Sequence, residues 1–209
     1  MLNIIVADRH PVVRKGVIHL IIGEYKDVQI FEAKSWANIL NALEKSTYDI
    51  LISDIFQDDT LRIEWVQQIS AKYPDLPILI LSSHAEEIFG VRMIKSGAMG
   101  YISKRCQPKE LLKAIGTLLN GKKYITSTLA ELMAEHLINN NKEVHHGLLS
   151  AREFEVLSHI ATGKNYSEIA KILFLSPNTI STYRSRIMGK MNFRNNYDLI
   201  RYSLDNKLV

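Results

Sequence analysis

The stretch IIVADRHPVV, residues 4–13, decides how the first part of the chain folds. Its apolar run has the length of a β-strand and ends in Asp8, and Pro11 then stands where a proline can open a helix. A buried strand that passes directly into a helix is typical of a parallel α/β sheet. Arg9 follows Asp8 at once, so a fixed positive charge stands beside the first carboxylate.

Four more apolar runs of strand length follow, at residues 28–32, 49–53, 77–82 and 99–103. The segments between these runs carry apolar residues at helical spacing. Strands that alternate with helices imply right-handed crossovers and a parallel sheet covered on both faces. We therefore predict an α/β domain with a doubly wound, five-stranded parallel sheet.

The composition, 46% hydrophobic and 23% charged over 209 residues, is typical of a globular protein with a proper core. No apolar run approaches the roughly 20 residues that cross a bilayer, and no signal-peptide pattern opens the chain. We expect a cytoplasmic protein without a membrane partner. The single cysteine, Cys106, is more simply an ordinary loop residue than a redox centre.

The composition changes after residue 121. A helical pattern covers residues 127–138, and the polar stretch NNNKEVHHG, residues 139–147, reads as a linker. No strand-like run follows, and the remainder reads as four short helices. We predict three segments: a sheet domain at 1–122, a linker helix and polar linker at 123–147, and an all-α domain at 148–209. His145 and His146 in the linker are more simply solvated than metal-bound.

Polar residues follow four of the five predicted strands, at the edge where the carboxyl ends of parallel strands meet. They are Asp8, Arg9, Asp54, Ser82 and Lys104. Such a set suits phosphoryl chemistry, with Asp54 as a nucleophile and with Lys104 and a hydroxyl holding the phosphoryl oxygens. Taken alone, Lys104 could equally be a solvated surface lysine and Tyr101 a core aromatic.

Residues 1–122 resemble the receiver domain of two-component response regulators. The segment YDILISDIF carries the phosphoacceptor at Asp54, ILILSS the switch hydroxyl at Ser82, and GAMGYISK the switch aromatic Tyr101 with Lys104. The resemblance implies phosphorylation of Asp54 by a sensor kinase, with Mg²⁺ held by acidic side chains.

Two positions depart from that family. Arg9 stands where the family has a second acidic residue that binds magnesium, and the loop IFQDD, residues 55–59, lacks the usual methionine and proline. We expect Arg9 to take the metal's position and pair with Asp54 or Asp8, because guanidinium matches a carboxylate. No cofactor is then expected, Mg²⁺ is disfavoured, and Asp8 and Asp54 are the ligands if any metal binds.

The predicted consequence is an atypical receiver that is poorly phosphorylated at Asp54. Two alternatives to an atypical receiver stay open. Asp58 or Asp59 could restore a carboxylate, or Arg9 could swing out to solvent, and the protein would then be a conventional Asp54-phosphorylated switch.

The last 62 residues carry a helix-turn-helix pattern. Ser150 and Glu153 form a capping box and Gly163 stops the helix that follows; the segment SEIAKIL makes a short helix, and Ser176 caps a longer one through Lys190. Ile180, Ile187 and Met191 fall on one side of that longer helix. The expected DNA contacts are Lys171, Asn178, Thr179, Ser181, Thr182, Ser185, Arg186 and Lys190. An ordinary surface helix of a bundle has the same periodicity.

Residues 148–208 resemble the LuxR-type helix-turn-helix, through Glu155-Val156-Leu157, Glu168-Ile169-Ala170, Ser176–Ile180 and Arg184–Met191. With the receiver, the whole chain is similar to the NarL/FixJ-type response regulators. The resemblance implies base contacts from Ser181, Thr182 and Ser185, and pairing of two domains through the final helix. Small hydroxyls discriminate bases weakly, so part of the preference would rest on phosphates and DNA shape.

The expected function is therefore a non-enzymatic, DNA-binding response regulator that controls transcription. Its expected partners are double-stranded promoter DNA, a second copy in a homodimer, and a possible sensor kinase. Two alternatives stay open: an auxiliary regulator that acts by heterodimerising with another regulator, and an enzyme that uses Asp8, Asp54 and Lys104 to hydrolyse a phosphate ester.

Overall fold

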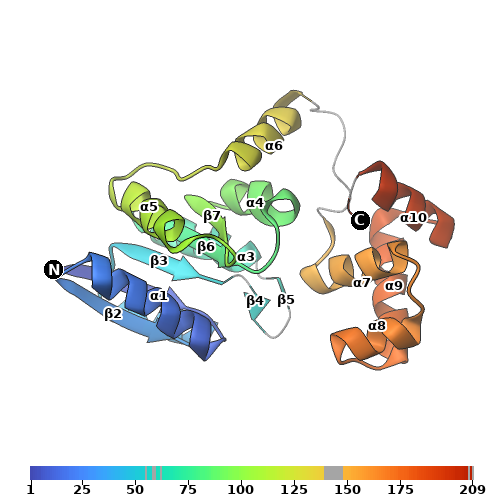
Figure 1. Ribbon diagram of the computed structural model, residues 1–209, viewed down its shortest axis with the longest axis horizontal. Coiled ribbons are helices and arrows are strands. Elements are labelled where there is room, and N and C mark those ends of the chain that lie inside the picture. The colour runs from blue at the N-terminus through green and yellow to red at the C-terminus, as the bar shows by residue number, and fades with distance from the viewer. Residues whose placement is uncertain (55, 58–59, 62, 139–147, 207, 209) are drawn as a thin grey trace. The chain divides into compact units, whose positions relative to one another are not determined.

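The computed structural model describes residues 1–54, 56–57, 60–61, 63–138, 148–206 and 208. The chain divides into two compact units (Figure 1). Residues 1–58 and 62–140 form the first, and residues 141–209 make up most of the second. The predicted linker at 139–147, with His145 and His146, lies outside the described residues.

The first unit is built on a five-stranded parallel sheet in the order β2-β1-β3-β6-β7. Its strands are β1 Leu2–Ala7, β2 Val28–Ala33, β3 Ile50–Ser53, β6 Ile78–Ser82 and β7 Gly100–Ser103. The predicted fold class and all five strand positions are confirmed. The central strands β1, β3 and β6 are almost wholly buried because helices cover both faces of the sheet.

Helices α1, Pro11–Glu24, and α5, Pro108–Leu119, cover one face of the sheet (Figure 1). Both helices begin at a proline, whose missing N–H costs nothing in the first turn. The other helices of the sheet domain are α2 Trp36–Lys45, α3 Ile63–Lys72 and α4 Glu86–Lys95. Trp36 and Trp65 stack with ring centroids 4.4 Å apart, so both act as packing residues between α2 and α3.

The loop after Asp54 forms a short two-stranded sheet from β4, Phe56–Gln57, and β5, Thr60–Leu61. This element was not predicted. Asp58 and Asp59, which could have restored a pocket carboxylate, lie outside the described residues.

Helix α6, Ser127–Ile138, has the predicted bounds and packs against α4. Leu129 is fully buried there, and a Cβ added to Gly90 would come within 2.8 Å of Leu129 Cδ1. The Thr126 hydroxyl donates to Glu86 Oε2 over 2.6 Å. Helix α6 therefore packs as part of the first compact unit, and the predicted domain bounds stay predictions.

The second unit contains α7 Ala151–Ala161, α8 Tyr166–Leu173, α9 Pro177–Met191 and α10 Asn196–Asp205. The predicted capping box of Ser150 and Glu153 is present, and Gly163 follows α7 with φ +83°. Asn165 caps α8 in the same way and Ser176 caps α9. Across the described part of the chain, no helix is both long enough and apolar enough to span a membrane.

Candidate functional site

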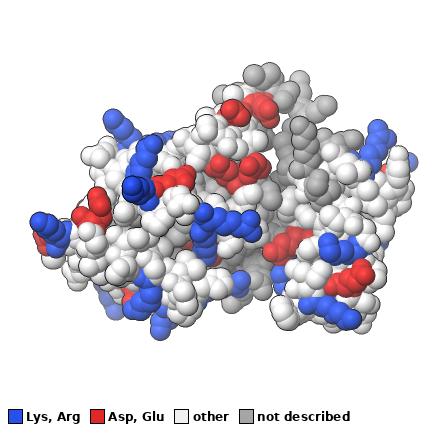
Figure 2. Space-filling view, in the orientation of Figure 1, with Lys and Arg blue, Asp and Glu red and all other residues white. Residues whose placement is uncertain are grey.

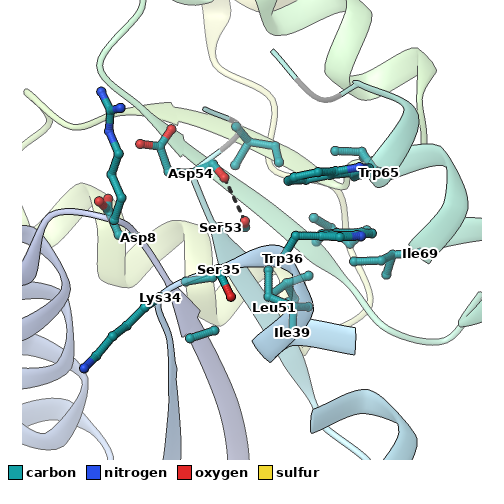
Figure 3. Close-up of a pocket in the computed structure, with 16 residues that line it drawn as sticks. Asp8, Lys34, Ser35, Trp36, Ile39, Leu51, Ser53, Asp54, Trp65 and Ile69 are labelled. Atoms are coloured by element: carbon teal, nitrogen blue, oxygen red, sulfur yellow. Dashed lines mark hydrogen bonds between the residues drawn. The ribbon is translucent and has the colours of Figure 1, made fainter. Parts of the chain in front are cut away.

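Three charged side chains meet at the carboxyl edge of the sheet. Lys104 Nζ, after β7, lies 2.6 Å from Asp8 Oδ2 and 2.6 Å from Asp54 Oδ2. The side chains are only 4% (Asp8), 6% (Asp54) and 9% (Lys104) exposed. Figure 3 shows Asp8 and Asp54 directed toward the same space from β1 and β3. The structure thus brings together three of the residues that the strand ends predicted.

The loop from β1 to α1 is held by Arg14, a buried residue that the sequence had not singled out. Its guanidinium donates 2.7 Å to the backbone oxygen of Asp8 and 2.8 Å to Glu32 Oε2. Hydrogen bonds from Lys15 and then Arg14 hold the pKa of Glu32 below its usual range. Arg14 therefore ties the loop to β2 and orients the segment that carries Asp8.

Arg9 has an exposed side chain at the start of this loop and lines the cavity beside the carboxylates. Lys104, which the sequence had assigned to the phosphoryl oxygens, lies on both carboxylates. Whether Arg9 takes the metal's position stays a prediction.

The predicted switch residues, Ser82 and Tyr101, meet at His84. Tyr101 is fully buried, and its hydroxyl donates to the His84 backbone oxygen over 2.9 Å. The His84 backbone N–H donates to Ser82 Oγ over 3.2 Å. Burial raises the pKa of the Tyr101 hydroxyl, although a hydrogen bond with Ser82 opposes the shift, so Tyr101 stays a donor at neutral pH.

An apolar cavity of about 40 Å³ lies beside the carboxylates (Figure 3). Ile39, Ile69 and the stacked pair of Trp36 and Trp65 form its wall, and Asp8, Asp54 and Arg9 also line it. One side of the pocket is therefore mainly apolar, and a low local dielectric constant strengthens the charge interactions at its edge.

Three side chains could supply ligands to a metal ion. Donor atoms of Asp8, His10 and Asp54 all lie within 4.8 Å of one another. Mg²⁺ prefers an all-oxygen octahedron, whereas one of these donors is an imidazole nitrogen, and Lys104 already contacts both carboxylates. His10 was missed from the sequence, although it follows Arg9 directly.

The long helix α9 of the second unit divides as predicted into two faces. Ile180, Ile187 and Met191 are buried, whereas Asn178, Ser181, Thr182, Ser185 and Arg186 are exposed. The Thr182 hydroxyl donates to the Asn178 oxygen over 3.0 Å, and the Ser185 hydroxyl to the Ser181 oxygen over 3.1 Å. These two hydroxyls therefore donate their hydrogen bonds to the helix backbone. Toward a base edge they offer only the lone pairs of their oxygens as acceptors. Thr179 is half-buried and occupied by the cap with Ser176.

The predicted basic contacts differ in their surroundings. Lys190 Nζ lies 2.7 Å from Oε2 of Glu153, whose side chain is 4% exposed. The charge of Lys190 is therefore partly balanced by a carboxylate of its own domain. Arg186 stacks over the Tyr183 ring at 6.0 Å, and Lys171 is exposed. Figure 2 shows basic and acidic side chains interspersed on the face in view, without one extended basic patch.

Helix α10 has both a core face and an exposed apolar face. Leu199 is fully buried in its own domain, while Leu204 is 59% and Tyr197 69% exposed. Leu199 therefore packs inside its own domain and Leu204 is exposed. Pairing of two domains through this helix stays a prediction.

Two family comparisons cover most of the chain. Residues 4–116 match the response regulator receiver domain, and residues 147–203 match the bacterial regulatory proteins of the luxR family. The first match alone spans more than half of the chain. The two matched ranges contain both sites described above.

Relatives and solved structures align with nearly the whole chain, across both matched ranges. The response regulator UvrY of Escherichia coli K12 is 30% identical over 99% of this chain and 97% of its own length. The oxygen regulatory protein NreC of Staphylococcus carnosus is 29% identical over 100% of this chain and 99% of its own length. The solved RcsB–DNA complex is 27% identical over 98% of both chains, with a TM-score of 0.57. RcsB of Salmonella enterica serovar Typhimurium bound to the rprA promoter with a phosphomimetic has the same identity and TM-score over 97% of this chain and 98% of that chain.

The five-stranded sheet with its charged carboxyl edge, the helix-turn-helix and the two family matches lead to one assignment. This chain belongs to the NarL/FixJ-type response regulators, in which a receiver domain precedes a LuxR-type DNA-binding domain.

Proposed function

We propose that this response regulator binds double-stranded promoter DNA as a homodimer and controls transcription, with a receiver that is poorly phosphorylated at Asp54. Such a role belongs in the cytoplasm, where the DNA is. The observation that carries the receiver part is the balanced pocket: Lys104 contacts both buried carboxylates, and Arg9 adds a second positive charge at its rim.

The DNA-binding part is supported by α9 and by the RcsB structures. Helix α9 exposes short polar side chains along one face and buries apolar ones along the other, as a major-groove helix requires. RcsB, which aligns with nearly the whole chain, has been solved bound to DNA, including two RcsB dimers on two DNAs. The exposed Leu204 and Tyr197 of α10 offer apolar surface for a comparable pairing.

The proposal that Asp54 is poorly phosphorylated rests on the charges in the pocket. A phosphoryl group on Asp54 brings negative charge that Mg²⁺ normally balances, and Mg²⁺ needs oxygen ligands that Arg9 and His10 do not provide. The positive guanidinium of Arg9 also repels a dication, which lowers the affinity of the pocket for Mg²⁺. We infer that Asp54 accepts a phosphoryl group slowly, and that the pocket turns over no phosphate ester as a substrate.

The test is the dimer fraction and DNA affinity of the purified full chain, with and without Mg²⁺ and beryllofluoride, for the wild type and for Arg9→Asp. Arg9→Asp restores an acidic residue next to Asp8, while Arg105→Asp, at another exposed arginine, is the matched control. We expect no response from the wild type or Arg105→Asp, and tighter dimerisation and DNA binding for Arg9→Asp. If the wild type itself responds, the receiver is a conventional phosphorylation switch.

One observation favours a second candidate, an auxiliary regulator that acts as a heterodimer. Thr182 and Ser185 donate their hydroxyl protons to the helix backbone, which leaves α9 with weak base readout. A self-sufficient regulator should bind DNA alone, with affinity that falls steeply with salt. Poor binding at every salt concentration, restored by a second regulator, would instead support the heterodimer.

A further inference from the structure

We propose that Thr182 and Ser185 read the major groove as hydrogen-bond acceptors, so that each contacts the amino group of an adenine or a cytosine. A carbonyl oxygen of guanine or thymine at the same place is disfavoured. This inference rests on the proposed function, because α9 must enter the major groove for it to hold. It deepens that function by stating which chemical group on the DNA the two hydroxyls recognise.

The two hydroxyls lie at the centre of the exposed face of α9. Asn178, Thr182 and Ser185 follow one another at spacings of four and three residues, which places them in one row along a helix. All three side chains are exposed. Ile180 and Ile187, on the opposite side of the helix, are fully buried. When the buried side packs on its own domain, this row faces the base edges.

The proton of each hydroxyl is directed to the helix backbone. Thr182 Oγ1 donates to the Asn178 backbone oxygen over 3.0 Å, and Ser185 Oγ donates to the Ser181 backbone oxygen over 3.1 Å. A hydroxyl has one proton and two acceptor lone pairs. With the proton engaged by the helix, each oxygen presents lone pairs to the DNA.

The base pairs differ in where they present a donor. Adenine carries an amino donor at N6 opposite the carbonyl O4 of thymine, whereas guanine carries the carbonyl O6 opposite the amino donor at N4 of cytosine. Amino and carbonyl groups therefore exchange places between an A·T and a G·C pair. An acceptor held at one place in the groove distinguishes adenine from guanine, or cytosine from thymine.

The size of the preference follows from the number of hydrogen bonds. Opposite an amino group, the hydroxyl keeps its bond to the helix and accepts a second bond from the base. Opposite a carbonyl oxygen, it can bond to the base only by turning its proton away from the helix, so one of the two bonds is lost. One neutral hydrogen bond corresponds to roughly 2- to 10-fold in affinity. A preference of that size at each position agrees with the weak readout expected of short hydroxyls.

Three variants isolate the hydroxyls. Thr182→Val removes Oγ1 and keeps the branched shape of the side chain, and Ser185→Ala removes Oγ. Both positions are exposed, so the domain should stay folded. Thr162→Val is the matched control, because Thr162 is exposed and its hydroxyl also donates to a backbone oxygen, that of His159, over 2.9 Å, but it follows α7 and lies outside α9.

The experiment has two steps. The purified full chain and its variants first select binding sites from random double-stranded DNA at one fixed salt concentration, which identifies the positions whose preference each hydroxyl sets. At those positions the amino group is then removed, with purine in place of adenine or pyrimidinone in place of cytosine. As the comparison, the carbonyl oxygen of the paired or competing base is removed, with aminopurine in place of guanine or methylpyrimidinone in place of thymine.

We expect removal of the amino group to weaken the wild type and Thr162→Val by roughly 2- to 10-fold. The same change should leave the affinity of the variant that lacks the matching hydroxyl unaltered, because the contact is already gone. Removal of the carbonyl oxygen should affect the wild type and the variants equally.

A loss of the amino group that weakens the wild type and the variants alike would overturn the acceptor readout. So would a carbonyl oxygen on which only the wild type depends, or a selected site in which no position depends on either hydroxyl. In all three cases the chain still selects DNA, so the proposed binding of promoter DNA stands. A wild-type chain that selects no sequence would refute that proposed function, and the acceptor readout with it.

Discussion

Replacing Lys104 by methionine should destabilise the receiver strongly, because Lys104 contacts two buried carboxylates at once. Each Nζ–Oδ2 distance is 2.6 Å, and the carboxylate side chains are 4% and 6% exposed. Each contact is worth roughly 6 kcal/mol of gross Coulomb energy at an effective dielectric constant of about 20. Desolvation offsets much of this, and breaking a buried pair typically costs about 3–5 kcal/mol net. We expect Lys104→Met to lower the free energy of unfolding of the receiver by that amount.

The chain offers an assay that reports on the receiver alone. Its two tryptophans, Trp36 and Trp65, both lie in the first unit and stack on each other. Urea unfolding of the full chain, followed by tryptophan fluorescence, therefore isolates the receiver from the DNA-binding domain. Lys113→Met, at an exposed position of α5, is the matched control and should change the free energy of unfolding by less than about 0.5 kcal/mol.

A loss for Lys104→Met no larger than for Lys113→Met would refute the reasoning, because the carboxylates would then be solvated or balanced without Lys104.

Three further perturbations test other parts of the structure. Burial alone would raise the pKa of Glu153, but hydrogen bonds from Lys190 and Ser150 outweigh it and lower the pKa from 4.5; the stability that Glu153 contributes should be present above pH 4.5 and be lost as the pH falls through the folded-state pKa. Circular dichroism should therefore show a weaker dependence on pH between 5 and 3 for Glu153→Gln, and an unchanged dependence would contradict this. Leu129→Ala, at a fully buried site, should cost about 2–5 kcal/mol in the packing of α6 on α4. Hydrogen exchange of residues 127–138 should then accelerate, whereas exposed Glu131→Ala should have no such effect. Arg186→Ala should weaken DNA binding and reduce the salt slope by about 1; Lys190→Met, whose charge is shared with Glu153, should change DNA binding less and stability more, and the reverse ranking would argue against this division of roles.

Local sequence chemistry predicted the elements of both domains. The five apolar runs became the five strands, and residues 127–138 became α6 within its predicted bounds. Ser150 with Glu153, and Ser176 with Pro177, marked two helix starts correctly. These signals act over three or four residues, so they survive without knowledge of the rest of the fold.

The candidate pocket was predictable for a different reason. In a parallel sheet every strand ends at the same edge, so Asp8, Asp54 and Lys104 had to meet once the strands were known. The contribution of His10 could have been suspected from its place directly after Arg9. The paired β4 and β5 strands could not, because the intervening sequence lacks an apolar run.

The sequence by itself determined the strand and helix positions, the edge where the charged residues gather, and the exposed polar face of α9. Only the tertiary structure decided which partners those residues take: Lys104 lies on both carboxylates, Lys190 pairs with Glu153 across 37 residues, and Leu129 packs against Gly90. The physical reason is range. Strand and helix signals arise from neighbouring residues, whereas an ion pair or a buried contact depends on side chains that only packing brings within a few ångströms.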